Sequence, residues 1–155
     1  MAGNSGKFRS YVWDPWLIIS QIIAVQFTFY FCLGVWMFSI DKMSGRIVDV
    51  NQIFDGKTHS FSSLDGRVVL IVFGLNSLTN SVALWFIVQR AKQCLDFAFT
   101  AHFIHFLICW TVIGFPKNWV WWLINVVCIT LTSVIGEYLC MRYEMKAIPI
   151  SVGRT

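Results

Sequence analysis

The chain has 155 residues, of which 57% are apolar and only 13% are charged, whereas soluble domains average about 45–50% apolar and about 25% charged residues. This composition predicts a membrane protein and excludes an ordinary soluble domain. The net charge of +4 is spread along the sequence, without the clustered basic patch of a nucleic-acid-binding protein. We therefore expect a lipid bilayer, and no nucleic acid, as the surroundings of this chain.

Aromatic residues make up 17% of the sequence. Trp and Tyr gather where an amphipathic ring can lie at the level of the lipid headgroups. Seven tryptophans fall near the ends of apolar runs, and we expect them to mark the membrane surfaces. They are Trp13, Trp16, Trp36, Trp110, Trp119, Trp121 and Trp122.

The first membrane span is expected at about residues 16–40. It follows a polar tail of ten residues and begins after Asp14-Pro15. Asp accepts hydrogen bonds from the free amides of a first helical turn, and Pro is tolerated there. The apolar run is longer than that of a signal peptide, and no small-residue cleavage site follows it, so we expect the span to be retained.

The second span is expected at about residues 68–88, after a hydrophilic connection at 41–67. This connection holds four basic and four acidic residues and also His59. Such a composition predicts a loop outside the membrane, which the topology argued below places in the lumen.

Two further apolar runs, at about 95–114 and 119–141, predict a membrane hairpin. Each is long enough to approach the thickness of a hydrocarbon core, about 30 Å. The residues between them, 115–118, include Pro116, which cannot donate a backbone hydrogen bond. A connection this short makes the two helices antiparallel neighbours.

The chain is thus predicted to be a single all-α membrane domain, residues 1–155, with four transmembrane helices. An even number of spans places both termini on one side of the membrane. Arg90 and Lys92 lie in a very short loop on that side, and basic residues in short loops favour the cytosol. We therefore expect both termini to be cytosolic.

Polar residues are concentrated in the predicted cytosolic half, within about 15 Å of that surface. Two interpretations remain open: hydrogen bonds that hold the helices together, or a cavity open to the cytosol that receives a partner. The opposite half holds Asn76 and Asn125. The residues concerned in the cytosolic half are Ser20, Gln21, Gln26, Asn80, Ser81, His102, His105, Ser133 and Glu137.

His102 and His105 are three residues apart and share a helical face, with Cys109 one turn further on. They could ligate a metal or haem, but no second ligand set appears on another span. We expect core histidines and no cofactor.

Glu137 is expected at the level of Asp96, at the headgroup boundary. There it could pair with Lys92 or Arg90, or it could contact a partner.

The five cysteines include no Cys-x-x-Cys sequence, which argues against thiol–disulfide chemistry of the kind that needs two neighbouring thiols. Apolar packing is the expected role. Cys94 and Cys140 lie beside basic residues at a membrane boundary, where palmitoylation occurs, so we expect them to be the candidates for acylation.

Four motifs, at residues 8–15, 90–97, 102–105 and 134–142, closely resemble the Sys family of Golgi integral membrane proteins. The resemblance extends from about residue 7 to Pro149. It implies a trans-Golgi receptor, not an enzyme, that recruits an N-terminally acetylated Arf-related small GTPase. The recruited GTPase would bring GRIP-domain tethers to the Golgi and support endosome-to-Golgi traffic.

No motif assigns the binding residues, so the site is inferred from position on the cytosolic side. We expect the acetylated segment of the GTPase to enter the polar half-cavity. The alternative is a small four-helix transporter or proton relay; a membrane oxidoreductase is disfavoured by the cysteine and histidine patterns. The expected partner-binding residues are Asp14, Gln26, Asn80, Arg90, Lys92, Asp96, His102, Glu137 and Arg142.

Overall fold

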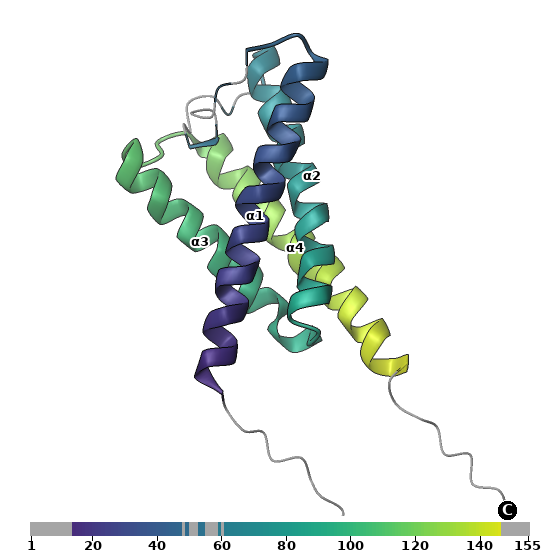
Figure 1. Cartoon of the computed structure of the whole chain (residues 1–155). Coiled ribbons are helices and arrows are strands. Elements are labelled where there is room, and N and C mark those ends of the chain that lie inside the picture. Colours follow the sequence, from purple (N-terminus) through teal and green to yellow (C-terminus); the bar gives the residue numbers. More distant parts are fainter. Residues whose placement is uncertain (1–13, 48, 50–52, 55–58, 60, 147–155) are drawn as a thin grey trace, which may run out of the picture.

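The computed structural model describes residues 14–47, 49, 53–54, 59 and 61–146. These residues form four long α-helices and one short 3-10 helix. The bounds are Pro15–Met43 for α1, Leu64–Ile87 for α2, Ala91–Gln93 for η2, Cys94–Val112 for α3 and Trp119–Lys146 for α4 (Figure 1). Four helical segments have the length and composition needed to cross a membrane: α1, α2, η2 together with α3, and α4. The predicted all-α fold with four transmembrane helices is confirmed.

Local sequence explains how α1 begins and how α3 ends. Asp14 Oδ1 accepts hydrogen bonds from two backbone amides of the first turn, at 3.1 Å and 3.4 Å, so the start predicted at Asp14-Pro15 is confirmed. Gly114 has a φ of +102°, a conformation that residues with a Cβ rarely adopt. α3 accordingly ends at Val112 instead of continuing to residue 114.

The helices α2 and α4 extend beyond the apolar runs that predict them. α2 begins at Leu64, because Ser63 Oγ accepts a hydrogen bond from the Gly66 amide at 3.1 Å and Asp65 stabilises the positive end of the helix dipole. α4 continues to Lys146. An apolar run marks the part of a helix inside hydrocarbon, and the polar turns beyond it carry no such signal.

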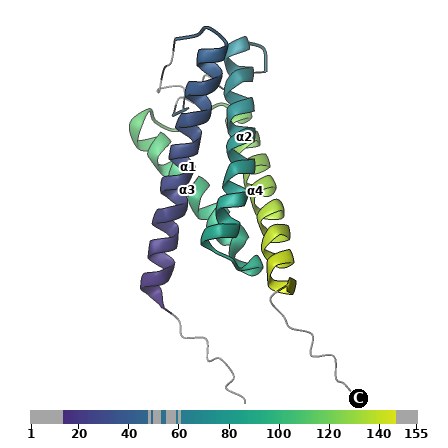
Figure 2. The same cartoon turned by 45° about the vertical axis from the view of Figure 1, so that its right-hand side comes forward.

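α2 and α4 are the most extensively packed pair of helices. α1 lies against the other side of α2, and α3 packs against α4. Contact between α1 and α3 is smaller, and Figures 1 and 2 show α3 leaning away from the other helices at one end. The predicted antiparallel hairpin of α3 and α4 is therefore present, with α2 on its far side.

The bundle has two distinct ends. The start of α1, residues 88–93 between α2 and α3, and the last turn of α4 lie at one end, which we call the terminal end (Figures 1 and 2). The end of α1, the start of α2 and residues 113–118 lie at the other, which we call the loop end. The first and last described residues of the chain thus share one side of the bundle.

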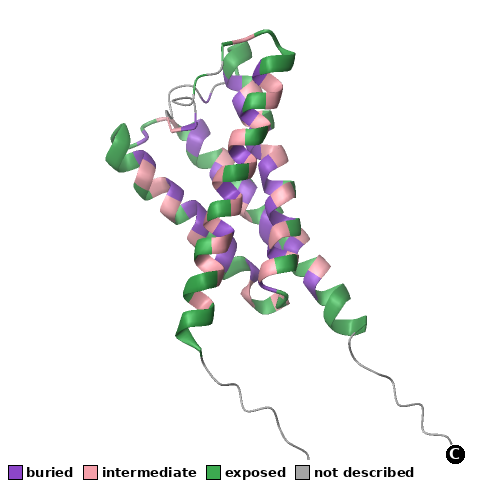
Figure 3. Ribbon diagram, viewed as in Figure 1, coloured by how far each residue is buried: buried purple, intermediate pink, exposed green. Residues whose placement is uncertain are grey.

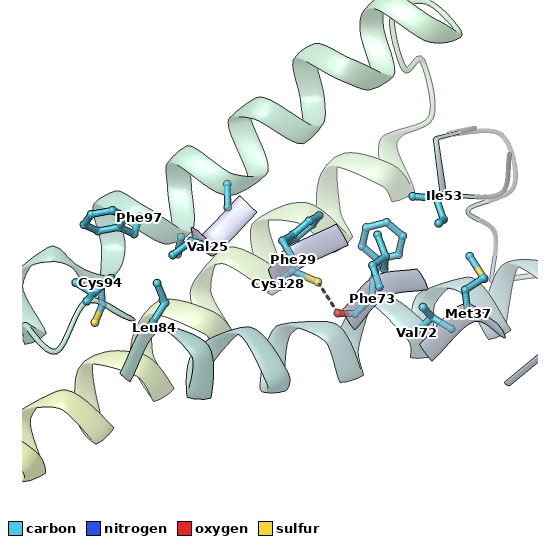
Figure 4. Close-up of a cluster of buried hydrophobic side chains, with 14 of the residues drawn as sticks. Val25, Phe29, Met37, Ile53, Val72, Phe73, Leu84, Cys94, Phe97 and Cys128 are labelled. Carbon is cyan, nitrogen blue, oxygen red and sulfur yellow. Dashed lines mark hydrogen bonds between the residues drawn. The ribbon is translucent and has the colours of Figure 1, made fainter. Parts of the chain in front are cut away.

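Apolar side chains fill the space between the helices and also cover their outer surfaces. Figure 4 shows part of the buried cluster, in which Phe29, Phe73 and Leu84 are almost completely inaccessible. Exposed residues line the outside of every helix (Figure 3). Among the large exposed apolar side chains are Phe27, Phe31, Phe86, Phe103 and Val126. A soluble monomer rarely exposes apolar area on this scale, so these faces are suited to contact lipid.

An ion-pair cluster joins α1 to α2 at the loop end. Arg46 Nη2 lies 2.9 Å from Asp65 Oδ1, and Arg46 Nε lies 3.8 Å from Asp41 Oδ1. Asp41 is fully buried, and a buried carboxylate is costly unless it is paired. Arg46 therefore stabilises the turn that follows α1.

His59 is not solvated, although it lies in the hydrophilic connection predicted at 41–67. Its side chain is fully buried and its ring contacts Phe73 edge to face, with ring centroids 5.2 Å apart. The Asn118 side chain donates a hydrogen bond to the His59 carbonyl. Part of this connection therefore packs onto the loop end of the bundle, which the charge count alone did not indicate.

Candidate partner-binding surface

Exposed charged residues gather at the terminal end. They come from the start of α1, the connection between α2 and α3, the first turn of α3 and the later turns of α4. Figure 3 shows the first turns of α1 and the last turns of α4 exposed on either side of this end. Six of the nine predicted partner-binding residues are exposed on these segments, namely Asp14, Arg90, Lys92, Asp96, Glu137 and Arg142.

A tight turn presents the two basic residues of the connection between α2 and α3. Gln89 has a φ of +56°, which reverses the chain after α2, and the amide of Gln93 bonds to the Arg90 carbonyl at 3.2 Å. Arg90 and Lys92 are both exposed. Their backbone is held close to α4, because the Ala91 amide donates a hydrogen bond to Glu144 Oε1 at 3.3 Å.

The carboxylate that meets this connection is therefore Glu144 and not Glu137. Of the two interpretations of Glu137, an ion pair with Arg90 or Lys92 is not observed, because Glu137 is exposed and forms no ion pair within the described residues; a contact with a partner stays a prediction. The reason is that α4 runs on to Lys146, so a later turn lies beside the connection.

The guanidinium of Arg142 lies 5.5 Å from the ring centroid of Tyr138. Such a cation–π contact contributes about 0.5–1 kcal/mol at an exposed site. The last turns of α4 therefore present a positive charge close to exposed aromatic and Met side chains. The latter include Tyr138, Met141, Tyr143 and Met145.

The other three predicted residues lie inside the bundle. Asn80 and His102 are buried and Gln26 is half-buried. Asn80 Nδ2 donates to the Asn76 carbonyl of its own helix at 2.9 Å. The cavity that Asn80 and His102 line measures about 10 Å³, room for a single water at most.

An open polar half-cavity is therefore absent from the described part of this structure. Several of the polar residues instead connect helices, as the alternative interpretation proposed. Gln21 Nε2 donates to the Ile87 carbonyl at 3.0 Å, and Thr132 Oγ1 donates to the Ser77 carbonyl at 3.2 Å.

Both membrane histidines are buried and hydrogen-bonded to neighbouring helices. His105 Nδ1 lies 3.1 Å from Tyr30 Oη, which joins α3 to α1. His102 Nδ1 lies 3.0 Å from Asn125 Oδ1, which joins α3 to α4. Because Asn125 Nδ2 donates to the Trp121 carbonyl at 2.8 Å, its Oδ1 is left to accept a hydrogen bond from His102.

The contact between His102 and Asn125 changes one sequence-based expectation. The sequence places His102 in the cytosolic half of the membrane and Asn125 in the opposite half. They are in fact direct partners. Residue counts along two antiparallel helices do not include the tilt between them, and α3 leans across the bundle (Figure 1).

The same two side chains lie at a hollow between α3 and α4. This cavity measures about 190 Å³ and has mainly aromatic walls, including Phe106, Trp121 and Trp122. It is smaller than most small-molecule sites, which measure about 300–1,000 Å³. Its lining includes exposed residues such as Phe103 and Val126, so it opens on a lipid-facing side.

Replacing His102 or Asn125 by leucine is expected to destabilise the bundle by about 1 kcal/mol, because each change leaves the other polar group unpaired in an apolar interior. The double replacement should cost less than the sum of the two single changes, since both remove one interaction. Thermal unfolding of the unmutated protein, the two single variants and the double variant in detergent measures this coupling. Strictly additive effects would show that the hydrogen bond contributes nothing.

Cys94 and Cys140, the candidates for acylation among the cysteines, are both completely buried. Their sulfur atoms are in contact, with 3.5 Å between them. Acyl transfer requires a thiol that can enter an enzyme's active site. The protein must then have room beside that thiol for a long acyl chain. The structure therefore does not support these two residues as acylation sites, and the reason is that α3 and α4 cover them.

The chain is similar to known proteins along most of its length. A family model described as an integral membrane protein linking to the trans-Golgi network matches residues 8–150. A SYS1 homolog of Nematostella vectensis is 56% identical over 146 residues, which cover 94% of this chain and 93% of the relative. A SYS1 homolog of Dictyostelium discoideum is 42% identical over 147 residues, covering 95% and 63%. SYS1 of Saccharomyces cerevisiae is 22% identical over 134 residues, covering 86% and 66%. No solved structure matches the chain.

Proposed function

Because the chain belongs to the SYS1 family of integral membrane proteins linked to the trans-Golgi network, we propose that it is a receptor for an Arf-related small GTPase. In this proposal the GTPase is N-terminally acetylated and is recruited to the trans-Golgi membrane. Recruitment brings GRIP-domain tethers to the Golgi and supports traffic from endosomes. The observation that carries the proposal is the gathering of exposed charged residues at the terminal end of the bundle.

The terminal end is suited to hold a protein at the membrane surface. Its charged side chains lie beside exposed apolar ones, including Trp16 and Leu17 on α1 and Tyr143 and Met145 on α4. Acetylation removes the charge of an N-terminal amine, so the remaining segment can lie among apolar groups at lower cost. A single weak membrane anchor binds a protein to a bilayer only marginally. A receptor surface increases the affinity of the GTPase for the membrane and determines which membrane it binds.

The acetylated segment is proposed to bind this exposed surface instead of the bundle interior. A cavity of about 10 Å³ between Asn80 and His102 cannot receive a peptide. Gln26 faces a gap between α1 and α3, lined by Phe97 and Thr100, in which no water-sized volume remains. Binding inside the bundle would require α1 and α3 to separate.

The alternative of a small transporter or proton relay has less support. Within the described residues, His102 and His105 each bond to a neighbouring helix. Hydrogen bonds of this kind are typical of helix association in membranes.

Co-purification with the GTPase in defined nucleotide states tests the proposal. Full-length chain is tagged, solubilised and incubated with the GTPase locked in its GTP-bound or GDP-bound form. We expect one nucleotide form to be retained in clear excess. Equal retention of both forms, at the level of an unrelated small GTPase, would contradict a receptor function.

The proposal also requires the terminal end to face the cytosol. We expect a cysteine introduced at Lys92 to react with a membrane-impermeant maleimide in intact Golgi vesicles, and a cysteine at Lys117 to react only after the membrane is permeabilised. Both side chains are exposed, at opposite ends of the bundle, so accessibility within the fold does not distinguish them. The reverse pattern would place the terminal end in the lumen and exclude it as a surface for a cytosolic GTPase.

A further inference from the structure

We propose that Cys94 and Cys140 form a reversible intramolecular disulfide, which makes the junction of α3 and α4 a redox-sensitive site. The proposal goes beyond receptor function and does not depend on it. Its basis is the contact between the two thiols at the terminal end of the bundle. Cys94 is the first residue of α3, and Cys140 lies in the later turns of α4.

The two sulfur atoms are 3.5 Å apart, and the Cys94 thiol is also 3.4 Å from the Arg90 carbonyl. A disulfide bond measures about 2.05 Å, so the sulfurs need to approach by about 1.5 Å. Both residues are completely buried, and Figure 4 shows Cys94 within the cluster of buried side chains.

Backbone features on both sides hold the thiols in register. Gly136 lies one turn before Cys140, and a Cβ added there would lie 3.7 Å from Cys94 Sγ and 3.3 Å from Leu84 Cδ1. The tight distance is the one to Leu84, so the missing side chain lets α2 pack closely on α4 here, while the start of α3 lies at ordinary contact distance. The hydrogen bond from the Ala91 amide to Glu144 joins the connection before α3 to α4.

The other three cysteines have different surroundings. Cys128 Sγ lies 3.6 Å from the Phe73 carbonyl (Figure 4), and Cys109 Sγ lies 3.5 Å from His105 Nε2. Cys32 is half-buried on α1. All five cysteines are in the described part of the chain, and Cys94 with Cys140 is the pair whose thiols are within hydrogen-bonding distance.

The oxidant in this proposal is hydrogen peroxide, which is close to water in size. A thiolate attacks one peroxide oxygen, which gives a sulfenic acid and, after protonation, one water. The second thiol then attacks the sulfenic sulfur and releases a second water. Two thiols lose two electrons and two protons, and peroxide gains them. Two molecules of a small thiol such as glutathione reduce the disulfide back to two thiols and are oxidised to one glutathione disulfide.

The covalent bond would fix the connection at residues 88–93 against α4. In the reduced protein the same segments are held by the Ala91–Glu144 hydrogen bond and by packing. Oxidation therefore restricts movement of this connection relative to α4 at the terminal end of the bundle.

Thiol counting on the full-length protein in nanodiscs tests the proposal. The protein is treated with hydrogen peroxide, with a free cysteine peptide in the same tube as an internal standard, and is then denatured and alkylated. We expect two of the five thiols to become resistant to alkylation and to return after reduction. Peptide mapping of the same unmutated sample should find Cys94 linked to Cys140.

Cysteine-to-serine variants identify which thiols react. Cys128→Ser should still lose two thiols, whereas Cys94→Ser and Cys140→Ser should lose none that reduction restores. The proposal is overturned if the unmutated protein keeps all five thiols while the peptide standard is oxidised, or if the linked peptides join other cysteines. Peptide mapping is done on the unmutated protein. It therefore tests the proposal even if one of the variants fails to fold.

Discussion

Replacing Arg90, Lys92 and Arg142 together by alanine is expected to weaken GTPase recruitment about tenfold or more. All three side chains are exposed at the terminal end. An exposed ion pair contributes about 0.2–1 kcal/mol, so three lost contacts cost about 0.6–3 kcal/mol. Because about 1.4 kcal/mol corresponds to a factor of ten in Kd, the middle of this range gives a loss of at least about tenfold. The measurement is the Golgi fluorescence of the tagged GTPase, together with the affinity of the purified receptor.

The matched control is alanine at Lys42, Arg67 and Lys117. These residues are also exposed but lie at the loop end, and the change in net charge is the same. Arg46 is unsuitable as a control because it pairs with Asp41 and Asp65, and Lys57 lies outside the described residues. An equal loss of recruitment in both triple variants, each correctly inserted, would place the GTPase surface elsewhere.

Trp121→Ala is expected to be the most destabilising single change, by up to about 3 kcal/mol. Trp121 is 1% exposed, stacks on His105 at 6.2 Å between ring centroids and contacts Trp122 at 5.1 Å. In soluble proteins such a truncation costs about 3–5 kcal/mol. The value here should lie at the low end, because lipid tails are as apolar as the core and only the packing contacts are lost. Thermal unfolding in detergent measures the effect.

Trp119→Ala is the control for that prediction, since it is the same change two residues earlier on α4. Trp119 is 67% exposed, so its removal leaves no internal cavity, and the cost should stay below about 1 kcal/mol. If both variants lose the same stability, Trp121 acts only as an aromatic residue of the membrane surface, as the sequence suggested.

The sequence predicted well those features that depend on the length of an apolar run or on local chemistry. The four spans, the Asp14-Pro15 start of α1 and the hairpin of α3 and α4 are of this kind. Each rests on interactions between residues close in the chain, or on the thickness of the bilayer. Such features need no knowledge of which helix faces meet.

Helix faces could not be predicted, because a transmembrane helix is apolar on its lipid side as well as on its packed side. Trp121 and Trp122 are neighbours of the same type, yet the first is buried and the second is exposed. The amphipathic pattern that identifies the core face of a soluble helix is missing here. Tertiary packing alone decides between these two residues.

The contact between Cys94 and Cys140 does not follow from short cysteine spacings. The absence of a Cys-x-x-Cys sequence excludes two thiols that are close in the chain, whereas an antiparallel hairpin also brings distant residues together. Cys94 starts one helix of the hairpin and Cys140 lies near the end of the other, so the predicted topology already placed them at a similar depth. That signal was available from the sequence.

The most direct test of the proposed function is binding of the purified GTPase to liposomes that contain the full-length chain. Acetylated GTPase in its active nucleotide state should bind these liposomes and not protein-free ones, and the unacetylated form should bind at least about tenfold more weakly, a difference of about 1.4 kcal/mol. The triple replacement of Arg90, Lys92 and Arg142 should reduce binding of the acetylated form. Equal binding to protein-free liposomes, or no difference between acetylated and unacetylated GTPase, would contradict a receptor that recognises the acetylated segment at its terminal end.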